Sequence, residues 1–228
     1  IKSHDITTYR PYAQQLAGII HRYAPQANLL VHQTWAYRKD DPRFRQAHPR
    51  KGEPTTQEMM YLGLSKAYST ITSELSAHRI PVGDAFWIAD HDQKFGYRID
   101  AGFDADKARD PALPTQKYSL HVGYRWRELD GRHKLSMDGH HANVAGEYLG
   151  ACVWFECLFG ENPVGNSFVP EQLDPAYATF LQRVAHRAAQ QADDIPSGLR
   201  DQKIPTFNDP APQRYTLQVR ASKVDPRV

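Results

Sequence analysis

The sequence predicts an α/β protein in which helices cover both faces of a parallel sheet, a three-layer α/β/α arrangement. Three observations indicate it. Segments with helical spacing alternate with short strand candidates over residues 1–90, as in crossover connections between parallel strands. The best strand candidate is a continuous apolar run, which is typical of a strand buried on both faces. A strictly alternating segment near residue 120 indicates an additional hairpin.

The first helix is predicted over residues 9–23. Its apolar residues recur at intervals of three and four, so we expect one buried face, and Pro25 ends the segment. The continuous run Leu29-Leu30-Val31, within residues 28–32, is the predicted interior strand. The apolar residues of the helix are Tyr12, Leu16, Ile19, Ile20 and Tyr23.

A charged loop, a second helix and a second strand follow. The proline-containing segment after Tyr37 is predicted to be a loop with solvated basic residues. Thr55 and Glu58 form a capping-box pattern at the start of a long helix that runs to Leu75. Ile80-Pro81-Val82 is the second strand candidate. The basic residues of the loop are Arg38, Lys39, Arg43 and Arg45.

The second half of the chain is predicted to contain a hairpin and two helices. Residues 90–114 lack periodicity and are expected to form a surface insertion, after which a turn at Asp130-Gly131 closes a hairpin that returns toward Asp138. Helices are predicted over residues 143–159, with Gly160 as the stop, and over residues 174–192. We therefore expect one domain over residues 1–192 and a proline-rich tail over residues 193–228.

Composition excludes several classes of protein. The chain has 228 residues with 28 basic and 26 acidic side chains, a formal charge of +2, and its basic residues are scattered. Nucleic acid and anionic membranes require a concentrated basic face, so neither partner is expected. The longest apolar stretch, residues 148–155, is far shorter than the roughly 20 residues that span a bilayer. Cys152 and Cys157 fit buried thiols better than a disulfide framework or a zinc site.

The segment from Ser136 to Gly146 carries the candidate chemistry. Asp138 precedes His141 by three residues, and Asn143 has the character of a helix N-cap, so we expect the pair on a loop that leads into a helix. A carboxylate in this position can bind one imidazole nitrogen and leave the other to act as a general base. Asp138 and His141 are therefore the candidate catalytic pair.

This segment resembles the last motif of the SGNH, or GDSL-type, hydrolases, and in particular a branch known only as a domain of unknown function. The motif is Asp, two residues and His, followed by a small polar residue and a glycine. Ala142 stands where the family often has proline. Residues 32–37 and 80–86 resemble the family's substrate-facing loop and pocket strand. The residues that match the motif are Asp138, His141, Asn143 and Gly146.

The resemblance implies a flavodoxin-like SGNH fold and hydrolysis of acyl esters, with an acetylated carbohydrate as the expected substrate and with no metal and no cofactor. His141 would act as the base and Asp138 would orient it. Gln33, Trp35 and Tyr37, together with His140, would contact the substrate. A secreted or periplasmic location is a further expectation from the family.

The family's nucleophile motif, Gly-Asp-Ser, is not found in the chain, nor are its glycine and asparagine motifs in the family's order. Gly83-Asp84-Ala85 has alanine in place of serine, and Gly160-Glu161-Asn162 comes too late. Ser3-His4-Asp5 cannot converge on one atom because its residues are consecutive. The chain opens with Ile1 rather than Met, so we expect the serine in a missing N-terminal portion and the 228-residue chain to be almost inert.

Two other functions stay open from the sequence. A non-catalytic carbohydrate-binding module would stack sugars on Trp35, Trp126 and tyrosines, and a metal-dependent phosphoesterase would use Asp138, His140 and His141 as ligands. Each residue also has a purely structural interpretation. The aromatic residues can be core residues, and Asp138 can be a helix cap with a surface histidine beside it.

Overall fold

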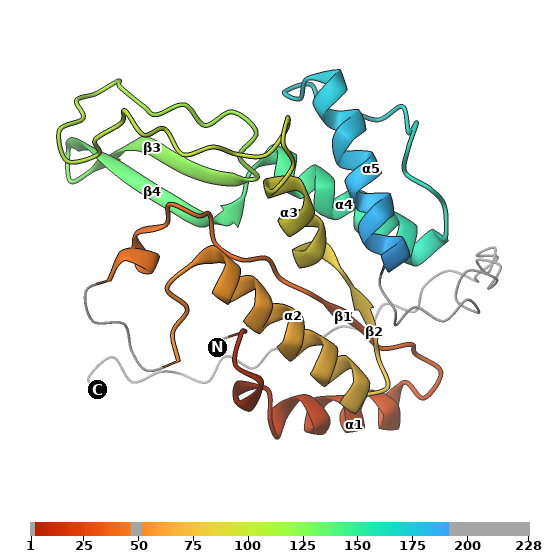
Figure 1. Cartoon of the computed structure of the whole chain (residues 1–228). Helices are drawn as coiled ribbons and strands as arrows, with labels where there is room; N and C mark the ends of the chain where they lie inside the picture. The colour runs from red at the N-terminus through yellow and green to blue at the C-terminus, as the bar shows by residue number, and fades with distance from the viewer. Residues whose placement is uncertain (1–2, 47–51, 192–228) are drawn as a thin grey trace.

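The structure is a computed structural model that describes residues 3–46 and 52–191 (Figure 1). The predicted tail over residues 193–228 lies outside the described residues. In chain order the elements are η1 (Ile6–Thr8), α1 (Tyr12–Tyr23), β1 (Leu30–His32), η2 (Pro42–Arg45), α2 (Gln57–Glu74), β2 (His78–Ile80), α3 (Val82–Asp90), β3 (His121–Leu129), β4 (Arg132–Ala142), α4 (Val144–Phe159) and α5 (Pro175–Gln191).

A small parallel sheet lies between two groups of helices. β1 and β2 pair in parallel, with Leu30 opposite His78 and His32 opposite Ile80. Successive side chains of a strand point to opposite faces of the sheet. Accordingly, Leu30 packs against the core shared by α3, α4 and α5, whereas Val31 packs against the residues of α2. The chain therefore has an α/β architecture with helices on both faces of the sheet.

The described residues contribute two parallel strands, fewer than the five of a flavodoxin-like sheet. The described strands therefore support an α/β class and do not confirm the finer prediction of a flavodoxin-like SGNH fold. Most of the apolar core lies on the α3, α4 and α5 side of the sheet, where Leu149, Val153 and Leu181 are almost completely buried. None of the helices in the described part of the chain is long and apolar enough to cross a membrane.

The hairpin prediction is confirmed. β3 and β4 form an antiparallel pair that projects from the helices (Figure 1). The turn residues Asp130 and Gly131 both have positive φ, 54° and 66°, as a two-residue hairpin turn that follows the strand twist requires. A register shift lies between His121 and Gly123. β4 continues to Ala142, so Asp138 and His141 lie on a strand and not on the predicted loop, because the pairing with β3 extends that far.

The start of α2 differs from the prediction, and α3 is not among the predicted helices. The N-cap of α2 is Thr56, whose side chain accepts a hydrogen bond from the Met59 N–H, and not Thr55. Val82 begins α3 rather than continuing a strand. Pro81 explains this, because proline has no N–H for a strand ladder and its fixed φ suits a helix start.

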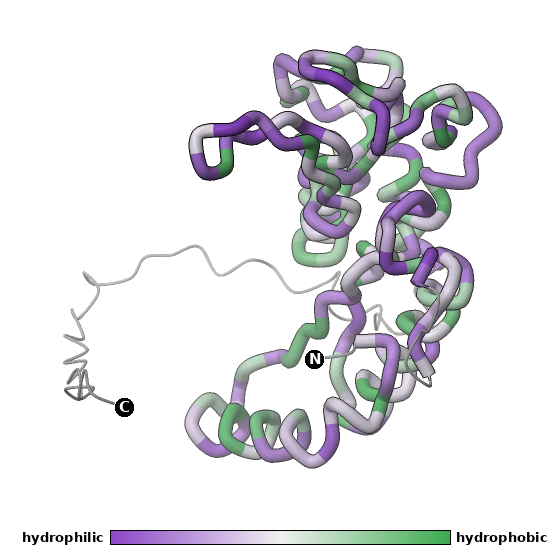
Figure 2. The backbone as a smooth tube through the Cα atoms, turned by 90° about the vertical axis from the view of Figure 1, so that its left-hand side faces the viewer, coloured by the Kyte–Doolittle hydropathy of each residue, from purple (hydrophilic) through white to green (hydrophobic). Residues whose placement is uncertain are grey.

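The prediction of a buried face on α1 is wrong for the described residues. The exposed fractions of Tyr12, Leu16, Ile19 and Tyr23 are 70%, 58%, 55% and 75%. The amphipathic pattern does form the helix, but in the described part of the chain only Ile20 of its apolar stripe is partly buried. Figure 2 shows α1 at the bottom, away from the hairpin and from α4 and α5.

The basic loop is only partly solvated, which corrects a second expectation. Arg38 is completely buried, and its guanidinium forms an ion pair with Asp40 at 2.6 Å and also bonds Gln116. Gly123 allows this arrangement, because a Cβ at that position would lie 2.2 Å from Arg38 Nη1. The loop after β1 is thereby tied to the base of the hairpin.

Candidate active site

Asp138 and His141 form a hydrogen-bonded pair at the end of β4. The Nδ1 atom of His141 lies 3.0 Å and 3.1 Å from the two carboxylate oxygens of Asp138, and the His141 backbone N–H donates to Oδ1 at 3.1 Å. The Asp138 side chain is 14% exposed and that of His141 is 71% exposed. The carboxylate thus binds Nδ1, and Nε2 is the nitrogen left for a reacting group.

Asp138 is ionised at neutral pH. Burial raises the pKa of its carboxyl group, but hydrogen bonds donated by the backbone and ring of His141 and by the backbone of His140 outweigh burial and lower the pKa to about 2. Arg125 lies 3.6 Å from the same carboxylate. An ionised carboxylate at Nδ1 selects the tautomer with its proton on that atom, and it stabilises a positive imidazolium.

Asn143 locks the pair to the start of α4. Its side-chain oxygen accepts hydrogen bonds from the backbone N–H groups of Ala145 and Gly146, which confirms the predicted N-cap. Its amide nitrogen donates to the carbonyls of Ser119 and His121 beside β3. A Cβ on Gly146 would lie 2.3 Å from the carbonyl oxygen of Leu120, so only glycine fits there. These contacts explain structurally why Asn143 and Gly146 follow the histidine.

His140 lies beside the pair and contacts the loop after β1. Its ring centroid is 4.2 Å from that of His141 and 5.7 Å from that of Tyr37, and its Nδ1 lies 2.8 Å from Nη2 of Arg43. Arg43 in turn is held by Asp41 through contacts of 2.9 Å and 3.0 Å and lies 3.9 Å above the Tyr37 ring. The predicted residues Tyr37 and His140 are therefore brought together.

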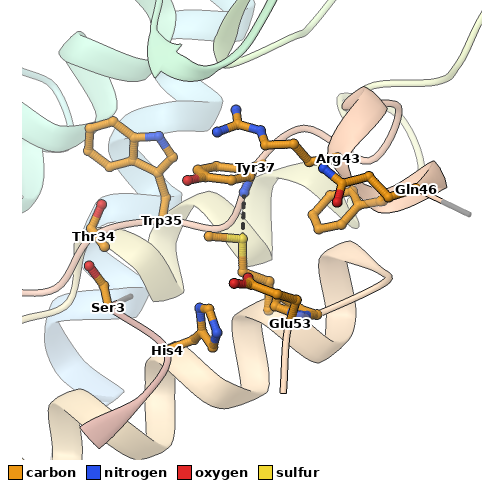
Figure 3. Close-up of a pocket in the computed structure, with 11 residues that line it drawn as sticks. Ser3, His4, Thr34, Trp35, Tyr37, Arg43, Gln46 and Glu53 are labelled. Atoms are coloured by element: carbon orange, nitrogen blue, oxygen red, sulfur yellow. Dashed lines mark hydrogen bonds between the residues drawn. The ribbon is translucent and has the colours of Figure 1, made fainter. Parts of the chain in front are cut away.

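A cavity of about 470 Å³ borders this group of residues (Figure 3). Tyr37 and Arg43 line it on the side of His140, and His4 and Glu53 lie on the opposite side. Trp35 also lines it and donates a hydrogen bond to the His140 carbonyl at 2.9 Å. The complete lining consists of Ser3, His4, Thr34, Trp35, Tyr37, Arg43, Phe44, Gln46, Glu53, Pro54 and Met60. Asp138, His140 and His141 are not among the lining residues, and His140 adjoins the cavity through its contacts with Tyr37 and Arg43.

Gln33 lies away from this cavity. It is completely buried, its side-chain N–H donates to Asp84 at 2.8 Å, and its side-chain oxygen accepts from the Asp84 backbone N–H at 3.2 Å. Asp84 also pairs with Arg79 at 2.9 Å. Gln33 therefore ties the end of β1 to the start of α3, and its role in substrate binding stays a prediction.

The three segments that imitate catalytic motifs have structural roles. In Gly83-Asp84-Ala85, the Asp84 side chain is bound by Gln33 and Arg79. In Gly160-Glu161-Asn162, Gly160 ends α4 with a positive φ of 69°. In Ser3-His4-Asp5, Asp5 caps η1 by accepting a hydrogen bond from the Thr7 backbone N–H, while Ser3 and His4 line the cavity. The sequence-based rejection of these motifs agrees with these contacts.

The structure adds Asp41 and Arg43 to the site. The sequence predicted Arg43 in a solvated loop and indicated no role for Asp41. Their signal is local: an aspartate before Pro42 is a good cap for a short helix, and Asp41 accepts the Arg43 backbone N–H at 2.9 Å. The contact with His140, however, spans 97 residues and leaves no pattern in the sequence. A Cβ on Gly139 would lie 2.5 Å from Asp41 Oδ2, so this glycine permits the close approach.

Asp138, His140 and His141 could also act as metal ligands by their chemistry. One ligand atom from each lies within 4.8 Å of the others. At His140 the Nδ1 atom is engaged by Arg43, so a cation would have to displace that guanidinium or bind Nε2. The cluster fits a hydrogen-bonded acid and base pair without any such rearrangement.

The fold and this site define an α/β protein with an exposed imidazole backed by a partly buried carboxylate. No protein-family model matches the chain, and no curated protein matches it. Among solved structures, a DUF4886 family protein from Bacteroides uniformis is similar, with a TM-score of 0.57 and 23% identity over 84% of this chain. The chain spans 59% of the length of that protein. At this identity the likeness shows a shared fold alone, and the neighbour's family is a domain of unknown function.

Proposed function

We propose that the chain belongs to an ester hydrolase of the SGNH type and supplies its acid and base. The observation that carries the proposal is the contact of 3.0 Å between His141 Nδ1 and the carboxylate of Asp138, with the imidazole exposed and the carboxylate ionised. The nucleophilic serine and the oxyanion-hole donors would come from residues outside these 228.

In this mechanism His141 Nε2 removes the proton from the serine hydroxyl as the serine oxygen attacks the ester carbonyl. The tetrahedral intermediate collapses, the bond to the alcohol breaks, and the imidazolium gives its proton to the departing alkoxide. Water then attacks the acyl-enzyme while His141 takes one of its protons. The carboxylic acid is released and the serine oxygen recovers its proton. Asp138 holds Nδ1–H throughout and stabilises the imidazolium.

An acylated carbohydrate, with acetyl as the acyl group, is the proposed substrate. The cavity next to Tyr37 and Arg43, both of which contact His140, supports this class because it has a volume of about 470 Å³ and is lined by Trp35 and Tyr37. One face of Trp35 is already stacked on Phe86 at 4.5 Å, and Arg43 covers one face of Tyr37. A sugar would therefore contact the remaining faces and edges of these rings. This step rests on analogy with related hydrolases.

The test uses the longer protein, expressed with the coding segment upstream of Ile1. Acetate release is measured from an aryl acetate and from an acetylated sugar. We expect His141→Ala to lower kcat by at least about a thousandfold and the 228-residue chain to show no turnover. His133→Ala is the matched control, because His133 lies on the same strand and forms a comparable pair with Asp110 at the other end of the hairpin. Equal rates for the two variants would refute the assignment.

The same experiment also tests a second candidate function, which the grouping of three possible metal ligands suggests. A metal-dependent phosphoesterase would use Asp138, His140 and His141 as ligands, in agreement with the 4.8 Å grouping of their ligand atoms. Such an enzyme would hydrolyse an aryl phosphate, lose activity to a chelator and resist a serine-directed inhibitor. An ester hydrolase would show the opposite pattern in all three measurements. Sugar binding without turnover of either substrate would instead indicate a binding module.

A further inference from the structure

Two neighbouring histidines compete for one carboxylate at the end of β4. Nδ1 of His141 lies 3.0 Å from Asp138 Oδ2, and Nδ1 of His140 lies 3.3 Å from Asp138 Oδ1. Either imidazole could donate a proton to Asp138 if that proton were on Nδ1. A catalytic pair requires that only one of the two imidazoles donates its Nδ1 proton to Asp138.

Arg43 makes the choice through its contact with His140. Its Nη2 atom lies 2.8 Å from His140 Nδ1. Arginine has N–H donors and no acceptor, and it stays charged in proteins, so the Nδ1 atom that it contacts must carry a lone pair. The proton of a neutral His140 is then on Nε2, and His140 Nδ1 has nothing to donate to Asp138.

The guanidinium is fixed in place before any substrate arrives. Asp41, which is 2% exposed, accepts from Nε and Nη2 of Arg43 at 2.9 Å and 3.0 Å. Tyr37 lies beneath the guanidinium at 3.9 Å. Figure 3 shows the Arg43 side chain extended over the Tyr37 ring. Arg43 is thus held on two sides, and the contact with His140 does not depend on a freely rotating side chain.

We propose that Arg43 is a positioning residue that keeps His140 Nδ1 unprotonated, with the ring proton on Nε2, and thereby reserves Asp138 for His141. Two adjacent histidines consequently carry opposite tautomers: His140 is protonated at Nε2 and His141 at Nδ1.

The consequence for the proposed function is a division of labour between the two imidazoles. His141 exchanges a proton at Nε2 with the reacting oxygens, and His140 offers a fixed N–H donor at Nε2. The tautomers themselves follow from contacts within the 228-residue protein. The catalytic consequence rests on the proposed function, whereas the tautomer assignment does not, so the two can fail separately.

The test is nitrogen-15 NMR of the imidazole rings in the 228-residue protein at pH 7.5, with His140→Gln and His141→Gln used to assign the signals. We expect a protonated Nε2 and a bare Nδ1 for His140, and the reverse for His141. In Arg43→Met the His140 proton should redistribute to Nδ1, with at least half of the population in that form. Arg45→Met is the matched control, since this nearby arginine makes no contact with His140, and it should give the wild-type spectrum.

Two results would overturn the proposal. One is a proton on Nδ1 of His140 in the wild-type protein, which tests the tautomer even where Arg43→Met does not fold. The other is a folded Arg43→Met protein whose His140 signals equal those of Arg45→Met. Neither result would affect the esterase test, which reads acetate release in the longer protein.

Discussion

Replacing Asp138 with Asn tests the electrostatic origin of the candidate site. The folded-state pKa of Asp138 is about 2, against an ordinary value of 3.8. Each pH unit between folded and unfolded pKa values is worth about 1.4 kcal/mol, so the ionised carboxylate contributes at most about 2.5 kcal/mol at neutral pH. The side chain is 14% exposed, and screening by water reduces this to about 2 kcal/mol.

The sign of the pH dependence follows from the lowered pKa. A carboxyl group that is more acidic in the folded state stabilises it above the unfolded pKa near 4, and this contribution is lost as the pH falls toward 2. Asp138→Asn should therefore cost about 2 kcal/mol of unfolding free energy at pH 7 and about half of that at pH 3. Urea denaturation of both proteins at the two pH values measures the difference.

Asp110→Asn is the matched control for this experiment. Asp110 pairs with His133, but their side chains are 40% and 60% exposed. An exposed pair contributes little, so this variant should stay within about 0.5 kcal/mol of the wild type. If Asp138→Asn behaved like Asp110→Asn, or if its cost did not shrink at pH 3, the hydrogen bonds to Asp138 would not have the strength that its lowered pKa implies.

Two further predictions concern the contacts that hold the site together. Asn143→Ala removes the cap of α4 and both hydrogen bonds to the carbonyls of Ser119 and His121. It should lower the free energy of unfolding in urea by about 2 kcal/mol, and a loss below about 0.5 kcal/mol would contradict this expectation. Arg38→Met leaves the buried Asp40 without its ion-pair partner and should cost about 3–5 kcal/mol in thermal or urea unfolding. Arg45→Met, at an exposed position in the same loop, should change stability by less than about 0.5 kcal/mol and is the control.

Local features of the fold could be predicted from the sequence. The Asp130-Gly131 turn, the Asn143 cap and the Gly160 stop all depend on a few neighbouring residues, and each appears where the sequence places it. The pairing of Asp138 with His141 is equally local, because the two residues are three apart. A local pattern is enough to specify such features, since their energy comes from contacts within one turn of chain.

Features that depend on distant partners could not be predicted. The apolar spacing in α1 predicts a helix, but it does not determine whether the apolar face is buried. That depends on the elements packed around the helix. The basic loop shows this most clearly: Arg38 is buried against Gln116, which precedes β3, and Met137 of β4, and Arg43 contacts His140 across 97 positions. Sequence spacing holds no information about such pairs, so their charge alone suggested solvent exposure.

The exposure of α1 has a consequence for the local stability of the molecule. Four of the apolar side chains of α1, Tyr12, Leu16, Ile19 and Tyr23, are more than half exposed, so packing adds little to its stability, and an isolated helix of 12 residues is marginal in water. Its backbone amides should exchange with solvent by local fraying, whereas those of α4 and α5 require loss of the shared core. We therefore expect α1 to fray while the core shared by α3, α4 and α5 keeps Asp138 and His141 in place.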